Sequence, residues 1–537
     1  MRINRMILVM LSLVLISVMG CRHQKPGEQD LLRVKSEQGS THKKVIFLMV
    51  DSLMAQAIDK GISQKQLPTF QYLIEHGQYY KDLVSSFPTM SVTIDSTMLT
   101  GKYPNGHGVP GLLWYSSDDK KMINYGTGPM EILKQGINPV LTDALIHLNG
   151  KHLNPDSPTI YEELARIGLK SGSINGLIYR GPTEHTLTIP DWIQGPTSLP
   201  KHIKVKGPDF LTLGALSNPL EGPKDTKNLP DDLTDRMGLN NKYAIEAVNY
   251  LIRANKLPDF LYVYLPDLDQ KLHKKGPSEL EGVKKVDQQL RAVLNAFGSP
   301  EKAFNEAIFV IAGDSGMTQL LPAEQRSEID MPAMLKGISV LKPGEKVKAE
   351  TEVALAVNET MAYVYNFKPS RSLRSLADIL SKDDRIDFVA WKENGWIHAL
   401  QGSTSKELRY KAKGNLIDRY KQTWTVKQDA DVLDLKLNAD HRTLDYGQYP
   451  DVLERLSGSL NSHKGEFLVV TAKPGYELAD RSSPTHAGGG GHGSIRQMES
   501  LVPLIIAGTN EKPANLRMVD LKAYLLDLLT NHVQKTK

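Results

Sequence analysis

Residues 43–51, which read KKVIFLMVD, decide the fold of this chain. The six residues from Val45 to Val50 are all apolar. Such a run is typical of a strand that is buried on both faces of a parallel sheet, because a strand with one exposed face alternates apolar and polar residues. Asp51 follows the run directly. Ligands of open α/β sheets bind beyond the carboxyl ends of the strands, so Asp51 is a candidate site residue.

Similar apolar runs recur along the chain and alternate with helical patterns. The further strand candidates are Phe260–Leu265, Ala307–Ala312, Phe467–Thr471 and Leu501–Ala507. Apolar residues recur at helical spacing between the runs, for example within Leu67–Gly77 and from Val283 to Phe297. This alternation predicts an α/β fold with a doubly wound, mostly parallel sheet and helices on both of its faces.

One region interrupts the alternation. From Ile338 to Glu466 the helical patterns are less regular and aromatic residues gather, with Trp391, Trp396 and Trp424 among them. We interpret residues 338–466 as an inserted α+β cap subdomain that lies over the active face. Residues 44–337 and 467–537 then form the catalytic domain.

The composition excludes several classes of protein. The chain has 537 residues, of which 40% are hydrophobic and 23% charged, and this is ordinary globular usage rather than that of a disordered or fibrous chain. The net charge is only +4, from 65 basic and 61 acidic residues, and this balance gives no reason to expect a nucleic-acid-binding surface. A single cysteine excludes a disulfide scaffold.

The N-terminus is typical of an exported protein. Arg2 and Arg5 precede an apolar run that ends at Met19, and the only cysteine, Cys21, follows Gly20. This pattern predicts a secretory signal, because the run is too short for a permanent membrane span. Residues 18–21 resemble the lipobox of bacterial lipoproteins, whose cysteine is acylated with chains such as palmitate. The alternative is an ordinary signal peptide with an accidental cysteine.

We therefore expect an exported protein that is lipid-anchored to the bacterial cell membrane through Cys21. Residues 1–21 are the expected signal peptide with its lipobox cysteine. Residues 22–43 are mostly polar, which predicts a flexible tether between the anchor and the catalytic domain.

Metal-binding residue types stand at the ends of several apolar runs. Asp51 and Asp314 each follow such a run, Asp269 follows another, and His492 precedes the run at Leu501. Asp269 and His273 are four residues apart, so one helical turn would direct both at a single ion. Carboxylates and imidazoles that converge from several strand ends suit a divalent metal, and mixed nitrogen and oxygen ligands favour zinc.

Five motifs together resemble the alkaline phosphatase superfamily, and within it the type I phosphodiesterase/nucleotide pyrophosphatase group. They occur in the family's order and span about residues 44 to 530: Val45–Asp51, FPTMS at 87–91 followed by LTGKYPNGHG at 99–108, DxxxHxxGP at 269–277, GDSGM at 313–317, and GHG at 491–493. The resemblance implies an alkaline phosphatase-like fold. It also implies two divalent metal ions, expected to be zinc, and a phosphate-ester substrate.

The resemblance further implies roles for individual residues. Ser91 would be the nucleophile that attacks phosphorus between the two ions. Asp51, Ser91 and Asp314 would hold one ion, and the second would be held by Asp269, His273 and His492. A hydroxyl needs this activation because it is a poor nucleophile near neutral pH. Thr89, two residues before Ser91, is the rival nucleophile.

Two positions depart from the family pattern. Ser315 stands where the family has a histidine after the aspartate, so one imidazole ligand is missing. Ile94 and Asp95 replace an Asn-His pair that follows the nucleophile, of which the asparagine is an oxyanion donor. We expect the site of Asp51, Ser91 and Asp314 to hold its metal less tightly and to prefer Mn²⁺ or Mg²⁺.

The expected function is metal-dependent hydrolysis of phosphate esters, diesters rather than monoesters. A second enzymatic interpretation is transfer of a phosphorylated head group to an acceptor in the cell envelope through the same phospho-Ser91 intermediate. An interpretation of a different class is a catalytically dead binding protein with the same fold. We interpret His107 as a residue that holds its loop by hydrogen bonds, and His486 as a weaker candidate for metal or phosphate contact.

Overall fold

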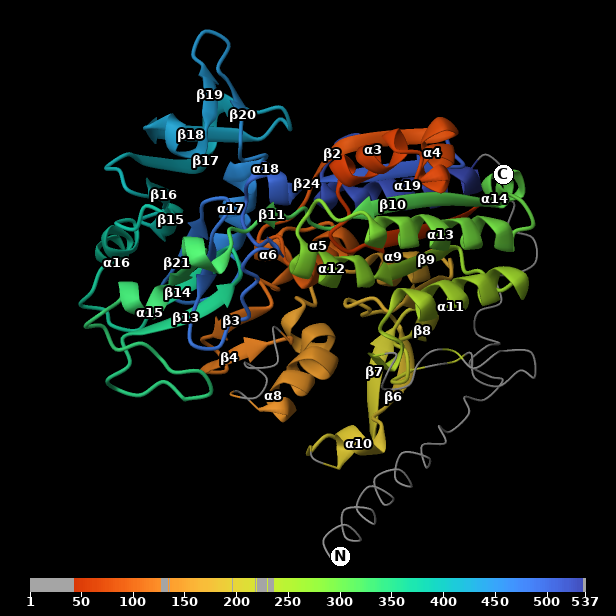
Figure 1. Ribbon diagram of the computed structural model, residues 1–537, viewed down its shortest axis with the longest axis horizontal. Helices are drawn as coiled ribbons and strands as arrows, with labels where there is room; N and C mark the ends of the chain where they lie inside the picture. The colour runs from red at the N-terminus through yellow and green to blue at the C-terminus, as the bar shows by residue number, and fades with distance from the viewer. Residues whose placement is uncertain are drawn as a thin grey trace, which may run out of the picture.

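The computed structural model describes residues 43–126, 134, 136–195, 197–217, 219, 229 and 236–534. Two large sheets lie side by side in it, each with its own helices (Figure 1). Cys21 and the rest of residues 1–42 lie outside the described residues, so the predicted signal peptide and lipobox are not part of the description. Among the described helices, none combines the length and the apolar character needed to cross a membrane.

The first sheet is the predicted one. Its seven strands are, in spatial order, β2 (Gly77–Val84), β24 (Leu501–Ala507), β10 (Ala307–Gly313), β1 (Lys44–Val50), β9 (Phe260–Leu265), β5 (Ser171–Ile174) and β8 (Phe210–Thr212). β1 is parallel to both β9 and β10, and β24 alone is antiparallel to its neighbours. The expectation of a mostly parallel α/β sheet is confirmed.

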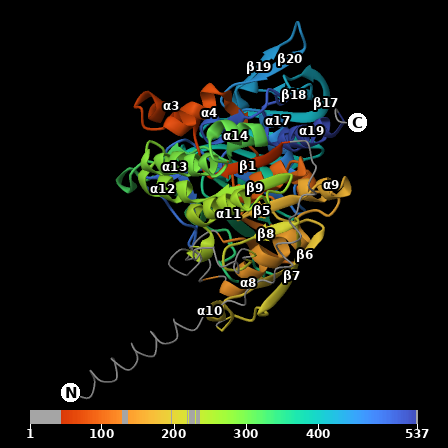
Figure 2. The same ribbon diagram turned by 90° about the vertical axis from the view of Figure 1, so that its right-hand side faces the viewer.

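Helices cover both faces of this sheet, and β1 shows how. Its residues Ile46, Leu48 and Val50 pack on one face, while Val45, Phe47 and Met49 pack on the other. The helices of the first face are α3 (Ala55–Ser63), α4 (Pro68–Glu75), α11 (Asn241–Arg253), α13 (Glu281–Ala296) and α14 (Pro300–Glu306). Those of the second face are α5 (Ser91–Thr100), α9 (Ile160–Arg166) and α19 (Leu521–Gln534), and Figure 2 shows α13 and α19 on opposite sides of β1.

The second sheet is mostly antiparallel. It contains β13 (Val353–Asn358), β14 (Met361–Asn366), β21 (Phe467–Ala472), β15 (Ile386–Glu393), β16 (Trp396–Gln401), β17 (Glu407–Ile417), β18 (Thr423–Gln428), β20 (Thr443–Tyr446) and β19 (Leu435–Asn438). The helices packed around it are α15 (Met331–Met334), α16 (Leu373–Leu380) and α17 (Val452–Leu460).

The position of β21 corrects the predicted domain boundary. We expected Phe467–Thr471 to begin the return of the chain to the catalytic domain, but β21 pairs with β14 and β15 inside the second sheet. Both faces of β21 are buried. A strand buried on both faces of either sheet would show the same continuous apolar run, so the sequence could not indicate which sheet it joins. A boundary at residue 466 cuts through the second sheet, and the chain returns to the first sheet only after Ala472.

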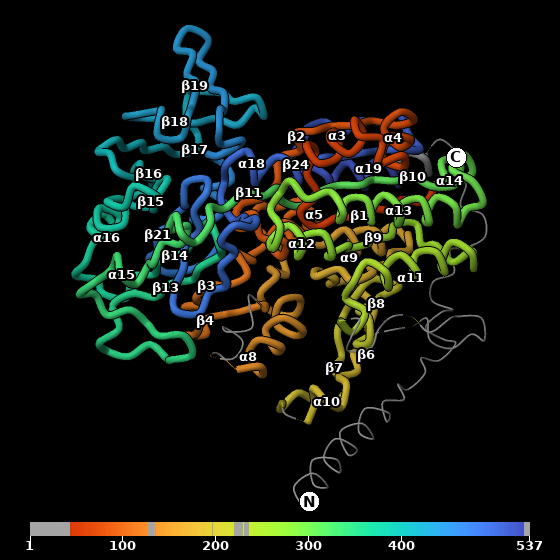
Figure 3. The backbone as a smooth tube through the Cα atoms, viewed as in Figure 1, coloured from red at the N-terminus to blue at the C-terminus, as the bar shows by residue number. Residues whose placement is uncertain are grey.

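Shorter elements connect these parts. The hairpins are β3 (Leu113–Ser116) with β4 (Lys121–Asn124), and β6 (Thr183–Thr188) with β7 (His202–Gly207). Small two-stranded pairs join β11 (Thr318–Gln319) to β23 (Gly490–Gly491) and β12 (Glu328–Asp330) to β22 (Glu477–Ala479). The remaining α-helices of the described residues are α6 (Pro104–His107), α8 (Ile137–Thr142), α10 (Asp191–Gln194), α12 (Asp267–Lys275) and α18 (Gln497–Ser500), and α8 continues into the π-helix η1 (Asp143–His152). Figure 3 shows β19 with β20, and α10 beyond β6 and β7, at opposite extremities of the fold.

Candidate active site

The ends of three adjacent strands bring three carboxylates together. Asp51 follows β1 and Asp314 follows β10, while Asp269 lies in the first turn of α12, directly after β9. Since β10, β1 and β9 are neighbours, their carboxyl ends meet at one edge of the sheet. This edge faces the second sheet, near the labels of α5, α12 and β11 in Figure 1.

Ser91 is the first residue of α5, which ends at Gly101 in a left-handed conformation. Its hydroxyl donates to Oδ1 of Asp51 at 3.4 Å. The first N–H groups of a helix have no partner within the helix, so this end of α5 presents donors and a positive dipole to an anion. The structure thus places the Ser91 hydroxyl beside a carboxylate and at the N-terminus of a helix.

Thr89, the rival nucleophile, has different surroundings. Its buried hydroxyl donates to the carbonyl of Ser494 at 3.1 Å and accepts from the backbone N–H of Gly493 at 2.8 Å. Both partners belong to the loop after β23. Thr89 therefore holds that loop in place, and its hydroxyl is already committed on both sides.

Asp269, His273 and His492 form a second cluster whose ligand atoms all lie within 4.8 Å of one another. Nε2 of His273 is 3.2 Å from Oδ1 of Asp269, and Nε2 of His492 is 3.6 Å from the same oxygen. The Nδ1 atoms point away, toward the carbonyls of Gly490 at 2.9 Å and Thr89 at 2.6 Å. An Nδ1–H bonded to a carbonyl leaves Nε2 free for a metal, which is the arrangement that metal-binding histidines adopt.

Glycines let the His492 loop come close to its neighbours. A Cβ atom on Gly489 would lie 1.8 Å from the carbonyl oxygen of His273, so only glycine fits there. Gly493 has a φ of +131° and approaches the carbonyl of Asn358 in the same way. Gly489 and Gly493, before and after His492, are thus needed because a side chain at these positions would clash with the neighbouring backbone. Their absence of side chains lets the loop bring the imidazole of His492 close to α12.

Among the described residues, no basic side chain forms an ion pair with either carboxylate at the Ser91 end, and the charge of His492 offsets their burial only in part. Burial and the nearby charges of Asp314 and Asp269 raise the pKa of Asp51 well above its usual range, although Tyr264 donates a hydrogen bond to it. Burial also raises the pKa of Asp314. Oδ1 of Asp314 accepts from the backbone N–H of Ser52 at 2.8 Å, whereas its buried Oδ2 has no hydrogen-bond partner among the described residues. A cation at this point would satisfy both carboxylates.

The histidine end of the site also favours positive charge. Burial lowers the pKa of His273, but the carboxylates of Glu359 and Asp269 outweigh this effect and raise it to about 9. The same two carboxylates hold the pKa of His492 well above its usual range despite its burial. Burial disfavours the charged form of Asp269, yet the two histidines hold its pKa well below its usual range. Both ends of the site therefore fit a divalent cation.

Glu359 is a site residue that the sequence analysis missed. It lies in the two-residue turn between β13 and β14 and has a φ of +57°. Oε1 is 3.7 Å from Nε2 of His273 and 3.9 Å from Nε2 of His492. The surrounding residues, VNET at 357–360, match none of the five motifs, so no pattern in the sequence pointed to it.

The departures from the family pattern have structural consequences. Ser315 is fully buried, and its hydroxyl lies 3.4 Å from that of Ser52, which in turn donates to Asp269 at 2.8 Å. The position expected to hold an imidazole therefore faces another serine. Asp95 is buried and accepts from the hydroxyl of Tyr262 at 2.7 Å, and burial raises its pKa well above its usual range.

The two histidines with weaker expectations differ in position. His107 is buried, lies 3.1 Å from the hydroxyl of Thr97 through Nε2 and accepts from the backbone N–H of Val109 through Nδ1. It stays within its own loop region, as interpreted from the sequence. The ring of His486 stacks on that of His273 with centroids 4.2 Å apart, and its Nδ1 is 3.3 Å from Glu477.

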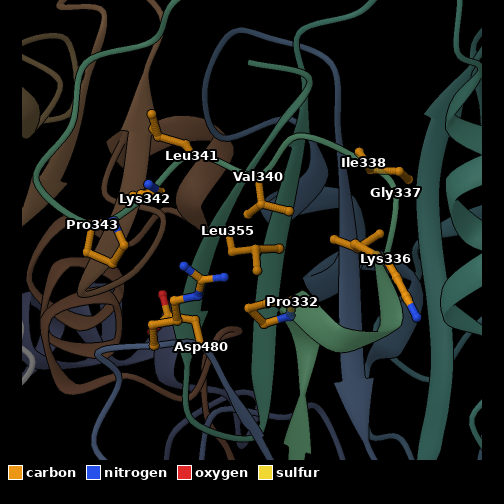
Figure 4. Close-up of a pocket in the computed structure, with 12 residues that line it drawn as sticks. Pro332, Lys336, Gly337, Ile338, Val340, Leu341, Lys342, Pro343, Leu355 and Asp480 are labelled. Atoms are coloured by element: carbon orange, nitrogen blue, oxygen red, sulfur yellow. The ribbon is translucent and has the colours of Figure 1, made fainter. Parts of the chain in front are cut away.

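A hollow of about 250 Å³ lies elsewhere on the molecule. It is lined by residues around α15 and the start of β13, and by Asp480 and Arg481 (Figure 4). None of the six predicted site residues lines it. The hollow is a separate feature of the second sheet.

The sequence profile of the type I phosphodiesterase/nucleotide pyrophosphatase family matches residues 45–495. The chain belongs to this family. The resemblance inferred from the five motifs is therefore confirmed, and the chemistry of the family is hydrolysis of phosphate esters. Among curated proteins, no sequence matches the chain.

Solved structures of the family have the same fold. Murine ectonucleotide pyrophosphatase/phosphodiesterase 5, as an inactive threonine-to-alanine variant in complex with AMP, has a TM-score of 0.53 at 13% identity over 91% of this chain and 95% of that one. The human protein of the same name has a TM-score of 0.52 at 14% identity, with the same coverage of both chains. At this identity the likeness shows the alkaline phosphatase-like fold of the chain.

Proposed function

We propose that this protein hydrolyses phosphate esters, diesters in preference to monoesters, with Ser91 as the nucleophile between two divalent metal ions. The proposal rests above all on the position of Ser91. Its hydroxyl lies at a helix N-terminus, 3.4 Å from Asp51, and the buried Oδ2 of Asp314 has no partner among the described residues. Asp51, Ser91 and Asp314 would hold one ion, and Asp269, His273 and His492 the other. Divalent ions in these positions supply activation of the hydroxyl and charge stabilisation at the attacking and leaving oxygens.

The side chains and the helix N-terminus have separate roles in the proposed reaction. Asp51 orients the Ser91 hydroxyl, and the N-terminus of α5 offers N–H donors to the phosphoryl oxygens. Oγ of Ser91 forms a bond to phosphorus while the bond from phosphorus to the leaving alcohol breaks. Water then forms the next bond to phosphorus, the Ser91 Oγ–P bond breaks, and the serine is restored. The histidines act through Nε2, because their Nδ1 atoms are directed at backbone carbonyls.

Release of nitrophenol from model diesters and monoesters tests the proposal. The metal-free protein should be inactive, and Zn²⁺ should restore activity, with faster turnover of the diester. The AMP complex of the murine neighbour makes nitrophenyl esters of nucleotides the first diesters to compare. If purified protein with two bound equivalents of metal releases no nitrophenol from either class, the enzymatic proposal is wrong and the binding-protein interpretation is favoured.

We also propose that the protein is exported and held at the bacterial cell membrane by a lipid on Cys21. Support comes from the sequence, because the only cysteine directly follows a short apolar run and a glycine. The polar residues 22–43 would separate the catalytic domain from the membrane surface. The substrate would then be a phosphate ester outside the cytoplasm.

A further inference from the structure

We propose that Glu359 is a fourth protein ligand of the metal ion at Asp269, His273 and His492, contributed by the turn of the β13–β14 hairpin. This inference rests on the proposed metal site but not on the proposed hydrolysis. It means that the second sheet supplies one of the ligands of the first sheet's active site.

The contacts of Glu359 place one oxygen at the ion position. Oε1 is 3.7 Å from Nε2 of His273 and 3.9 Å from Nε2 of His492, on the same imidazole atoms that face Asp269. Ligand atoms around a tetrahedral zinc ion are about 3.4 Å apart, given bonds of about 2.0–2.2 Å. The four nitrogen–oxygen separations between the two histidines and the two carboxylates, from 3.2 to 3.9 Å, are of that size.

The other oxygen of Glu359 fixes the side chain. Oε2 accepts from the backbone N–H of His492 at 3.1 Å, so the carboxylate and the His492 ligand are held to each other. The carbonyl of His492 accepts from the backbone N–H of Thr360, the second residue of the same turn. Glu359 has a φ of +57°, a left-handed conformation that is unfavourable for a non-glycine residue and persists where the surroundings fix it.

Charge balance supports the same conclusion. Each ion position is flanked by two carboxylates, Asp51 with Asp314 at one and Asp269 with Glu359 at the other. Two carboxylates neutralise one divalent ion when the imidazole ligands are uncharged. The Glu359 side chain is only 12% exposed, and its partners among the described residues are the two imidazoles and the backbone N–H of His492. A carboxylate so far removed from water needs a positive partner, which a divalent ion supplies when the imidazoles are neutral ligands.

With four protein ligands, the ion at Asp269 and Glu359 would differ in function from the ion at Asp51 and Asp314. A structural zinc site is closed by four protein groups, while a catalytic site keeps an open position. The ion at Asp269, His273, His492 and Glu359 would thus be the tightly held one. A substrate oxygen could reach it only by displacing Glu359 or by raising the coordination number to five.

Among the described residues, His486 offers a competing arrangement. Ligand atoms of His273, Glu359 and His486 also lie within 4.8 Å of one another. However, Nδ1 of His486 is directed at Glu477, and the ring stacks on His273 rather than meeting it edge to edge. The geometry favours the cluster that includes Asp269 and His492.

Metal binding to the full-length apo-protein tests the proposal without any substrate. Zn²⁺ affinity is measured by competition with a chromophoric chelator, and coordination by the visible absorption of Co²⁺ in the same sites. Glu359→Gln should weaken one of the two ions about tenfold or more and alter the absorption of that Co²⁺ alone. The matched control is Glu352→Gln, since Glu352 pairs with Lys368 and Arg371 on the surface of the second sheet and should change neither readout.

Three results would overturn the proposal. The first is affinity within threefold of the wild type with an unchanged spectrum. The second is weaker binding with an unchanged spectrum, which would mean that Glu359 acts only through its charge. The third is a larger loss in His486→Ala than in Glu359→Gln. If Glu359→Gln does not fold, Glu359→Asp withdraws the carboxylate by one methylene and is judged by the same criteria.

Discussion

Ser315 is the residue at which this chain departs most clearly from its family. A neutral imidazole is a good zinc ligand, whereas a serine hydroxyl binds weakly unless it loses its proton. In the structure the Ser315 hydroxyl lies 3.4 Å from the Ser52 hydroxyl. The neighbour of Ser315 is thus another serine rather than a histidine that could supply the missing imidazole. His486, the weaker candidate for metal or phosphate contact, does not replace this imidazole, because its ring stacks on His273 at the other end of the site.

Two unequal classes of metal site should follow in the wild type. In Ser315→His the weaker class should tighten about tenfold and shift its preference from Mn²⁺ or Mg²⁺ toward Zn²⁺. Titration of the apo-protein with each ion measures both affinities, and the class at Asp269, His273 and His492 is the internal control. Equal and tight binding of two zinc ions by the unmodified protein would contradict this prediction.

At the residue scale, the motifs predicted which side chains lie close together, while their roles stay predictions. The spacing of Asp269 and His273 predicted that both would face one ion, and the structure places them 3.2 Å apart. The choice of Ser91 over Thr89 rested on family register alone, because the hydrogen bonds of Thr89 to the His492 loop are contacts between distant residues. Glu359 could not be found, since its proximity to His273 depends on how the second sheet packs against the first.

At the scale of elements, the glycine-rich loop of His492 is the part most sensitive to substitution. Gly489 packs against the carbonyl of His273, at the α12 end that presents an imidazole to the site. The atom nearest to Gly489 is a backbone oxygen, which cannot move aside as the end of a flexible side chain can. The loop and the helix therefore hold their two histidines at a fixed separation.

Gly489→Ala should separate the loop from α12, because its Cβ would lie 1.8 Å from the His273 carbonyl oxygen. We expect a loss of about 1–3 kcal/mol in the free energy of unfolding, together with weaker Zn²⁺ binding. Urea unfolding of the apo-protein and chelator competition measure the two effects. Gly150→Ala, in a helix and where an added Cβ meets nothing within 4 Å, should lower neither; equal losses in the two variants would show that the close approach is unimportant.

The positions of the strands along the sequence were predicted better than the sheet to which each strand belongs. The runs at β1, β9, β10 and β24 were identified with their correct sheet: the first three are each followed by a candidate site residue, and His492 precedes the fourth. β21 was assigned to the wrong sheet. A strand that is buried on both faces is apolar at every position. Its sequence therefore has no alternation that would indicate which strands pair with it.

At the scale of the whole molecule, buried histidines should make the fold sensitive to acid. Burial lowers the pKa of His107 and of His463 to about 3, against about 6.5 in an unfolded chain. The unfolded state therefore binds protons first as the pH falls, so the stability that these neutral imidazoles contribute above about pH 6.5 is lost between there and about pH 3.

His463→Gln should flatten this acid dependence by at most about 1.4 kcal/mol per pH unit. His463 is the better position to change, since its hydrogen bond to Tyr365 belongs to the second sheet and not to the active site. Urea unfolding at several pH values gives the slope. His441→Gln, in the exposed turn between β19 and β20, is the control. An identical slope in the wild type and His463→Gln would refute the assignment.

Anchoring is the other property of the whole molecule that can be tested. If Cys21 is acylated, the protein produced in bacteria should partition into the detergent phase, and Cys21→Ala should remain in the aqueous phase without the lipid mass. Phase separation followed by mass spectrometry of the N-terminal peptide measures both. The same mass and partitioning in the two proteins would remove the lipoprotein proposal and leave the ordinary signal peptide.

The central claim is that Ser91 attacks phosphorus, and trapping its covalent intermediate tests this most directly. Metal-loaded protein is mixed with a nitrophenyl diester, quenched in acid within the first turnovers, digested and examined by mass spectrometry. The account predicts a phosphoester on Ser91 in the wild type and in Thr89→Ala. In Ser91→Ala it predicts neither adduct nor turnover, with nitrophenol release lower by several orders of magnitude and zinc still bound. An adduct on Thr89, or near-normal turnover by Ser91→Ala, would contradict it.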